Sequence, residues 1–266
     1  MDKNLIIGFA TGKYANIESM MNFCISLRKY YDGKAVLITD SGEEEFVSFL
    51  KSYDIIVLKT NKLISIEDLM LDRWSIPIKV IKMFKDAENV ILSDTRDLIY
   101  QANPFDYVVG DDLELTTEVK TIEQCPQWNT RWVKNMYGEE AYQLVKDQNI
   151  ICGGYMIGKR DSLIKLCEIV LEESKKYPKT LPGQPPVFVD QATMNVFYKQ
   201  GKLPSTTLHH TGGPFVATIG GSMGTTELDE EGYLINKDGV RPAVVHQYDR
   251  HQHVVEAFNN RLRKGN

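Results

Sequence analysis

The first sixty residues alternate between short apolar runs and helical segments, and this alternation limits the folds open to the chain. Apolar runs at residues 5–9, 35–39 and 54–58 have the length of buried strands. Segments with helical periodicity lie between them, at residues 17–30, with Asn16 as the expected cap, and at residues 43–51. A β-α-β-α-β series places its strands in a parallel sheet covered by helices, with ligands at the carboxyl ends of the strands. We therefore expect an α/β fold with a mostly parallel central sheet flanked by helices.

Composition adds limits on size, charge and compartment. With 266 residues, 42% of them hydrophobic, the chain can bury the core of one large domain. Its 36 acidic and 31 basic residues give a net charge of -5, which argues against a nucleic-acid partner. No apolar run has the length of a membrane span or of a signal peptide core, and the 4 cysteines form no Cys-x-x-Cys pair. We predict a soluble cytoplasmic protein with reduced thiols and at most peripheral membrane contact.

The rest of the chain extends the α/β pattern. Periodicity predicts helices at residues 78–85, 124–142, 161–176, 189–200 and 254–263, and strands at residues 89–93, 150–158 and 243–246. Gly153 and Gly154 interrupt the second of these strands, and glycines within a strand mark the close approach of a backbone or a ligand. Residues 208–226 are rich in glycine, threonine and histidine without clear periodicity, so we expect a long loop facing the site.

Two aspartates, Asp94 and Asp97, follow the strand predicted at residues 89–93. A divalent cation held by carboxylates neutralises a diphosphate without proton transfer, and strand ends are where ligands bind. A helix cap or a solvated turn explains the same spacing as well, because Asp-x-x-Asp loops are common. Arg96, between the two acids, is either a phosphate clamp or the ion-pair partner of an aspartate.

Four segments of the chain form an ordered set that extends this picture. They are residues 90–97 with Pro104 and Phe105 behind them, the Cys152-Gly153-Gly154 segment, residues 190–195, and residues 244–250. Together they resemble the GT-A fold glycosyltransferases, with a layout similar to the GT8-type retaining galactosyl- and glucosyltransferases. The resemblance spans about residues 5–250. It implies transfer of a sugar from a nucleotide-diphosphate donor, expected to be a UDP-sugar, with retention of the anomeric configuration.

The resemblance also implies a metal site. It gives the family's acidic positions to Asp94 and Asp97 and its late histidine to His246, around Mn²⁺ or Mg²⁺. We expect the metal, together with Arg96 or lysine side chains, to stabilise the departing diphosphate. The family has Asp-x-Asp, whereas two residues separate the acids here. This difference leaves open which aspartate binds the metal and which meets the ribose. For His246 the alternative is a hydrogen-bonded core histidine.

The donor sugar is expected to lie against two further segments. Asp190 and Gln191 resemble the family's Asp-Gln pair at the start of a helix, which implies that Asp190 binds sugar hydroxyls and Gln191 lies beneath the anomeric carbon. A helix N-cap is the alternative for Asp190. Gly153 and Gly154 resemble the segment that passes close to the sugar, although Cys152 stands where the family has Asn. Tight packing would also explain these glycines.

Residues after the first strand are expected to bind the nucleotide. By the resemblance, Thr11 hydrogen-bonds to the base and Tyr14 stacks on it. Asp40 and Arg73 are weaker candidates for the same pocket, because charged residues are ordinarily solvated. The loop is neither a GxGxxG nor a P-loop, so the phosphate cradles of dinucleotide- and ATP-binding proteins are missing from the sequence.

These inferences predict a single GT-A-type domain over residues 1–266. Residues 1–112 are expected to bind the nucleotide, and residues 113–266 the donor sugar and the acceptor. The expected partners are a nucleotide-sugar donor and a glycan or lipid-linked acceptor. One alternative is a sugar-phosphate nucleotidyltransferase, which should have a glycine- and arginine-rich loop after the first strand. The other is a non-catalytic nucleotide-sugar or glycan-binding protein on the same fold.

Overall fold

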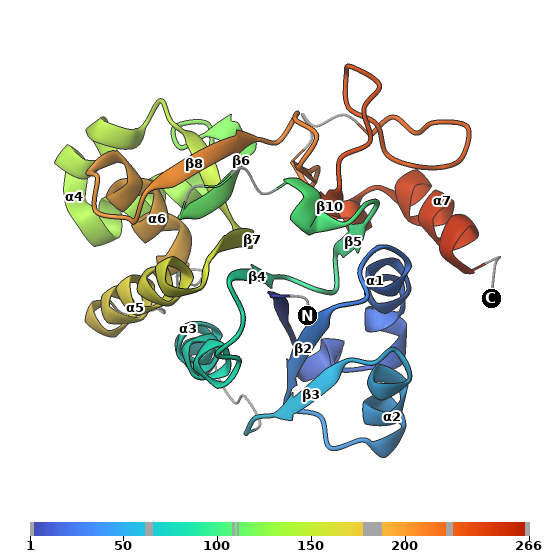
Figure 1. The fold of residues 1–266 in the computed structure, drawn as a ribbon. Coiled ribbons are helices and arrows are strands. Elements are labelled where there is room, and N and C mark those ends of the chain that lie inside the picture. The colour runs from blue at the N-terminus through green and yellow to red at the C-terminus, as the bar shows by residue number, and fades with distance from the viewer. Residues whose placement is uncertain are drawn as a thin grey trace.

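A central seven-stranded sheet organises the part of the chain that the structure describes, in the order β3-β2-β1-β4-β7-β6-β8 (Figure 1). This computed structural model describes residues 3–61, 66–107, 110, 112–177, 188–221 and 226–263. The strands are β1 (Asn4–Ala10), β2 (Lys34–Thr39), β3 (Ile56–Lys59), β4 (Asn89–Ser93), β6 (Leu113–Thr121), β7 (Asn149–Lys159) and β8 (Thr206–His210). Strand β7 is antiparallel to both neighbours and the other pairs are parallel, so the prediction of a single α/β domain with a mostly parallel sheet is confirmed.

Helices cover both faces of this sheet. They are α1 (Ile17–Tyr30), α2 (Glu44–Ser52), α3 (Ile66–Met83), α4 (Arg131–Val145), α5 (Arg160–Lys176) and α6 (Val189–Lys199). The last helix, α7 (Gln252–Arg263), packs instead with residues such as Val245 and Tyr248. Helices α1 and α2 lie on one face, and α3 and α5 on the other (Figure 1). None of the helices in the described ranges is both long and apolar enough to cross a lipid bilayer.

Alternating side chains of the strands fill the two resulting cores. Leu5 and Ile7 of β1 pack with α3 and α5, whereas Ile6 between them packs with α1 and α2. All three side chains are almost completely buried. A sheet covered on both faces needs apolar residues at odd and even positions alike. This explains why β1, β2 and β4 are continuous apolar runs rather than alternating ones.

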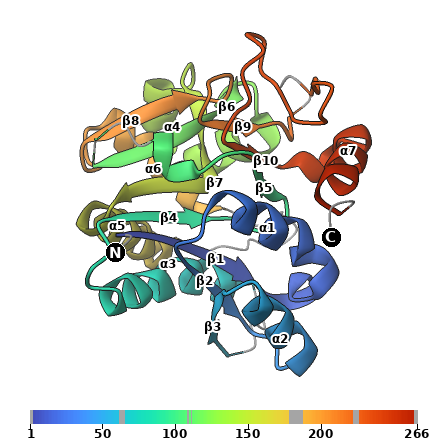
Figure 2. The same cartoon turned by 45° about the vertical axis from the view of Figure 1, so that its right-hand side comes forward.

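A small second sheet lies between the central sheet and the C-terminal helix α7 (Figure 2). It contains β5 (Leu98–Tyr100), β10 (Val244–His246) and β9 (Val216–Thr218), with β10 in the middle. Strand β10 runs antiparallel to β5, which aligns His246 with Leu98. Through this pairing the late part of the chain returns to the loop that follows β4.

Several elements differ from the sequence-based predictions. Strand β7 continues through Gly153 and Gly154 without interruption, and α3 begins at Ile66 rather than at residue 78. Residues 208–226 are not one loop, because they contain the end of β8 and all of β9; residues 222–225 lie outside the described residues. The reason is long-range pairing: β8 adds to β6 and β9 to β10, and such pairing overrides weak local preferences.

The N-terminus of α1 is capped by Asn16, as its sequence predicts. Its Oδ1 accepts a hydrogen bond from the N–H of Ser19 at 2.9 Å, and its Nδ2 donates to the carbonyl of Lys13 at 2.7 Å. We expect Asn16→Ala to lower the free energy of unfolding by about 1 kcal/mol. Asn16→Asp keeps the cap acceptor but loses the donor to Lys13, so it should lose less. Urea unfolding measures both variants, and equal losses would contradict this role of the cap.

Candidate functional site

The site forms where the strand order of the central sheet reverses. Strands β2 and β3 lie on one side of β1, and β4 lies on the other. Open α/β sheets bind ligands at the carboxyl ends of the strands beside such a switch point. The loop after β4 contains Asp94 and Asp97, and the loop after β1 contains Thr11 and Tyr14. Residues that the sequence singles out therefore gather at one edge of the sheet.

Backbone pairing brings Asp94, Asp97 and His246 together. The N–H of Asp94 donates to the carbonyl of Gly154 at 2.7 Å, which continues the β4–β7 ladder by one residue. His246 is aligned with Leu98, the residue after Asp97, in the β5–β10 pair. One carboxylate oxygen of each aspartate and one ring nitrogen of His246 lie within 4.8 Å of one another. The predicted convergence of these three residues is thus present in the structure.

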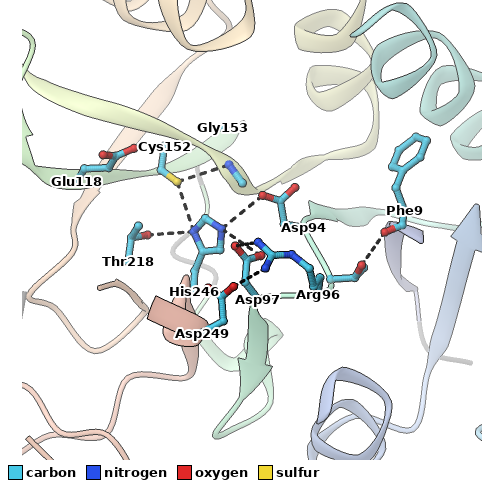
Figure 3. Close-up of polar contacts among 12 residues, drawn as sticks. Phe9, Asp94, Arg96, Asp97, Glu118, Cys152, Gly153, Thr218, His246 and Asp249 are labelled. Atoms are coloured by element: carbon cyan, nitrogen blue, oxygen red, sulfur yellow. Dashed lines mark hydrogen bonds and ion pairs between the residues drawn. The ribbon is translucent and has the colours of Figure 1, made fainter. Parts of the chain in front are cut away.

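The imidazole of His246 is held by contacts at both ring nitrogens (Figure 3). Its Nδ1 lies 3.5 Å from Cys152 Sγ and 3.4 Å from Thr218 Oγ1. Its Nε2 faces Asp94 Oδ2 at 3.4 Å and Asp97 Oδ1 at 3.9 Å, and no hydrogen-bond partner reaches it within the described ranges. The side chain is 1% exposed, and a buried nitrogen without a hydrogen bond is costly. A divalent cation between the nitrogen and the two carboxylates would satisfy it.

Two glycines of β7, Gly153 and Gly154, leave the space that the site side chains occupy. A Cβ on Gly154 would lie 2.5 Å from His246 Nε2 and 2.7 Å from Asp94 Oδ2, so any larger residue would push the two side chains apart. On the opposite side of the strand, a Cβ on Gly153 would lie 3.3 Å from Asp190 Oδ2. The expectation that these glycines mark close approach is confirmed, and the approaching groups are the predicted site residues.

The charge states in the cluster follow from burial and from neighbouring ions. Burial opposes ionisation of Asp94, but Arg73 and His246 outweigh it and lower its pKa to about 2. Burial dominates for Asp97, and its pKa lies above the ordinary value of 3.8. For His246 burial disfavours the charged form, but Cys152 and Asp94 raise its pKa well above 6.5. Positive charge on Arg73 and His246 thus favours the ionised form of Asp94.

Arg73 of α3 links the cluster to the part of the site that contains Asp190. Its Nη2 lies 2.9 Å from Asp94 Oδ1 and donates to the carbonyl of Gly153 at 2.7 Å. Its Nε lies 3.9 Å from Asp190 Oδ2. In the sequence Arg73 is only a weak candidate, because charged residues are ordinarily solvated. In the structure its guanidinium contacts two carboxylates and one backbone carbonyl of the site.

Asp190 and Gln191 lie in the first turn of α6, next to β7. Asp190 is 4% exposed, and burial raises its pKa although Arg73 acts against this. The N-cap position belongs to Phe188, so the alternative of Asp190 as the helix cap is wrong. The Nε2 of Gln191 donates to Glu118 Oε1 at 3.0 Å. Both residues line the same pocket as the Asp94, Asp97 and His246 cluster.

A pocket of about 320 Å³ connects these groups, which is within the usual range for small-molecule sites. The sequence prediction missed several residues of its wall, because strand β6 was not predicted and the others have no local signal. The run of β-branched residues in β6 could have indicated a strand. The lining residues are Arg73, Asp94, Arg96, Asp97, Glu118, Trp132, Cys152, Gly153, Gly154, Phe188, Asp190, Gln191, His246, Gln247 and Arg250.

Gln247 has a left-handed backbone conformation at the edge of the pocket, with φ 60° and ψ 34°. This region is uncommon for a residue other than glycine, and holding it costs on the order of 1 kcal/mol. Its N–H donates to the carbonyl of Asp97 at 2.7 Å. The strained residue thus ties the loop after β4 to the segment after β10.

The remaining predicted residues lie beside the pocket rather than in its wall. Tyr14 lies in a 3-10 turn (Gly12–Tyr14), and the guanidinium of Arg96 is 4.7 Å from its ring centroid. Asp40 Oδ1 accepts a hydrogen bond from the N–H of Gly12 at 2.9 Å, next to Thr11. Thr11, Tyr14 and Asp40 therefore lie together at the ends of β1 and β2, and Arg96 connects Tyr14 to the site.

Arg96 itself is bonded to two carboxylates. Its Nη2 donates to Asp97 Oδ2 at 3.0 Å, and its Nη1 donates to Asp249 (Figure 3). A direct contact with phosphate would require Arg96 to leave one of these partners. In this conformation Arg96 links the loop after β4 to the turn Tyr248–Arg250.

Neither a comparison with models of protein families nor a comparison with curated proteins gives a match to this chain.

Removal of Arg73 should destabilise the protein, because the Asp94 carboxylate loses its ion-pair partner. Breaking a buried pair costs about 3–5 kcal/mol, but the Asp94 side chain is 34% exposed, so we expect Arg73→Met to lower the free energy of unfolding by about 2 kcal/mol at neutral pH. The lowered pKa of Asp94 stabilises the fold above pH 3.8, and this contribution is lost as the pH falls toward 2. The difference between Arg73→Met and the wild type should therefore shrink below pH 3.8.

Urea unfolding across this pH range measures the difference. Lys3→Met is the control, because Lys3 and Glu88 form an exposed pair whose loss should leave the free energy of unfolding nearly unchanged. A deficit of Arg73→Met that does not vary with pH would contradict the assignment.

Proposed function

We propose that the chain is a metal-dependent glycosyltransferase of the GT-A type. It would transfer a sugar from a nucleotide-diphosphate donor, a UDP-sugar, to a glycan or lipid-linked acceptor. The observation that carries this proposal is the convergence of Asp94, Asp97 and His246 in the same pocket as Asp190 and Gln191. In such an enzyme the metal and diphosphate site adjoins the site of the donor sugar, and the pocket that these five residues share supports the proposal.

The residues present fit a divalent cation. The buried Nε2 of His246 has no hydrogen bond within the described ranges and faces two carboxylates, and Gly154 leaves room for His246 and Asp94. Asp94, Asp97 and His246 would hold Mn²⁺ or Mg²⁺, which supplies positive charge against the departing diphosphate. Arg73, bonded to Asp94, keeps that carboxylate ionised and oriented.

The other side of the pocket would hold the donor sugar. Asp190 is a buried carboxylate in the first turn of α6, which fixes its position for accepting hydrogen bonds from sugar hydroxyls. Gln191 lies beside Asp190 and would lie beneath the sugar, and Gly153 places no side chain against either residue. Tyr14 would stack on the base and Thr11 would hydrogen-bond to it, at the ends of β1 and β2.

Activity assays with the metal present test the proposal. The wild-type protein should release UDP from a UDP-sugar in the presence of Mn²⁺, and a chelator should abolish the release. We expect Asp97→Ala and His246→Ala to lose most of this activity, because each removes a group facing the cation. His253→Ala, an exposed histidine outside the pocket, is the matched control and should keep full activity.

Three outcomes would contradict the proposal in different ways. Full activity of Asp97→Ala and His246→Ala would exclude the site. Release of diphosphate from UTP with a sugar phosphate, without transfer from a UDP-sugar, would indicate the nucleotidyltransferase. Binding of UDP-sugars in calorimetry, without turnover on a panel of donors, would indicate a non-catalytic binding protein.

Direct binding of the cation provides a separate test. We expect Gly154→Ala to weaken Mn²⁺ binding by about tenfold or more, because a Cβ would displace His246 and Asp94. Gly42→Ala is the control, since a Cβ there would meet no atom within 4 Å among the described residues. Titration of Mn²⁺ followed by electron paramagnetic resonance measures both affinities. Equal Mn²⁺ affinities for the two variants would show that the cation does not bind at this cluster.

A further inference from the structure

The side-chain amide of Gln191 has a defined orientation in the pocket. Its Nε2 donates to Glu118 Oε1 at 3.0 Å and to the carbonyl of Ile151 at 3.3 Å. We propose that Glu118 is a positioning residue, which fixes the Gln191 amide so that its oxygen faces the donor sugar. The catalytic meaning of this orientation rests on the proposed glycosyltransferase function.

The chemistry of the two partners determines which end of the amide faces them. The Ile151 carbonyl can only accept hydrogen bonds, and an ionised carboxylate at Glu118 can likewise only accept. Both N–H groups of the Gln191 amide must therefore point to Glu118 and Ile151. The amide oxygen is turned away from these two acceptors, and within the described part of the chain no donor contacts it.

Strand pairing explains how the two acceptors come to lie side by side. Glu118 follows Thr117 in β6, and Thr117 is aligned with Ile151 of β7. Gln191 reaches this pair from the first turn of α6. Burial raises the pKa of Glu118, while the N–H of Gln191 favours the ionised form. Removing a carboxylate from solvent costs free energy unless the group is hydrogen-bonded. The hydrogen bond from Gln191 therefore stabilises Glu118 in its place in the pocket wall.

The orientation has a consequence for chemistry at the anomeric carbon. An amide oxygen carries partial negative charge and stabilises positive charge that develops nearby in the transition state, whereas an N–H in its place would oppose it. Gly153 allows the approach, because a Cβ there would lie 3.3 Å from Gln191 Cγ. Loss of the orientation should therefore lower kcat and leave the KM for the donor nearly unchanged.

A pair of matched variants separates orientation from charge. Glu118→Gln keeps an oxygen that accepts from Gln191, whereas Glu118→Met keeps the length of the side chain and removes the acceptor. We expect Glu118→Met to lower kcat about tenfold, the effect of one lost hydrogen bond, and Glu118→Gln to keep most of it. The double variant Glu118→Met/Gln191→Ala should match Gln191→Ala alone. Thermal unfolding checks that all four variants fold.

Two kinetic results would overturn the proposal. If Glu118→Gln loses as much kcat as Glu118→Met, the negative charge of Glu118 acts by itself. If Glu118→Met lowers kcat equally in the Gln191→Ala background, Glu118 does not act through Gln191.

A spectroscopic measurement tests the orientation without any activity. The side-chain amide of Gln191 gives a ¹⁵N resonance that is identified by its loss in Gln191→Ala. Its protons should exchange slowly with solvent in the wild type and in Glu118→Gln, and faster in Glu118→Met. Equal exchange in Glu118→Met and the wild type would overturn the positioning role. A wild-type protein inactive on every donor would instead count against the proposed function, and the exchange result would still decide the role of Glu118.

Discussion

The site depends on the close approach of Asp94 and His246 across Gly154. This approach exists because β7, the antiparallel strand of the central sheet, has a glycine at the point where the β4–β7 ladder ends. Strand β10 then delivers His246 to the same point by pairing with β5. Two separate sheets therefore meet at one residue without a side chain, and a methyl group there would separate the carboxylate from the imidazole.

Two arginines hold this arrangement together by bridging carboxylates from different elements. Arg73 of α3 lies between Asp94 and Asp190, and Arg96 lies between Asp97 and Asp249. Charges in a partly buried site are costly unless they are paired, so each bridge both neutralises the acids and fixes their positions. The loop after β4, helix α3, helix α6 and the turn after β10 are consequently linked by electrostatics, in addition to the apolar cores on either side of the sheet.

The sequence predicts the parts of the fold that are encoded locally. The apolar runs of β1, β2 and β4 and the Asn16 cap of α1 are such features, and so is the placement of Asp94 after a strand. Strands β6 and β8 were not predicted, although the β-branched residues of β6 favour a strand, because their polar residues are accommodated only by pairing: buried Glu114 of β6 lies 2.5 Å from His209 of β8. For a similar reason the sequence does not indicate Glu118 and indicates Arg73 only weakly. The partners of both side chains lie far away in the sequence.

The three clustered side chains differ in exposure, which shows the side from which the cluster is accessible. The side chain of Asp94 is 34% exposed, that of Asp97 8%, and that of His246 1%. The cluster thus opens toward the pocket at Asp94, which also pairs with Arg73, and closes at the imidazole, which Cys152 and Thr218 hold from behind. A cation held by these groups would face the pocket on its Asp94 side. That side adjoins the pocket wall formed by Asp190 and Gln191, so a diphosphate and the sugar attached to it would enter from the same opening.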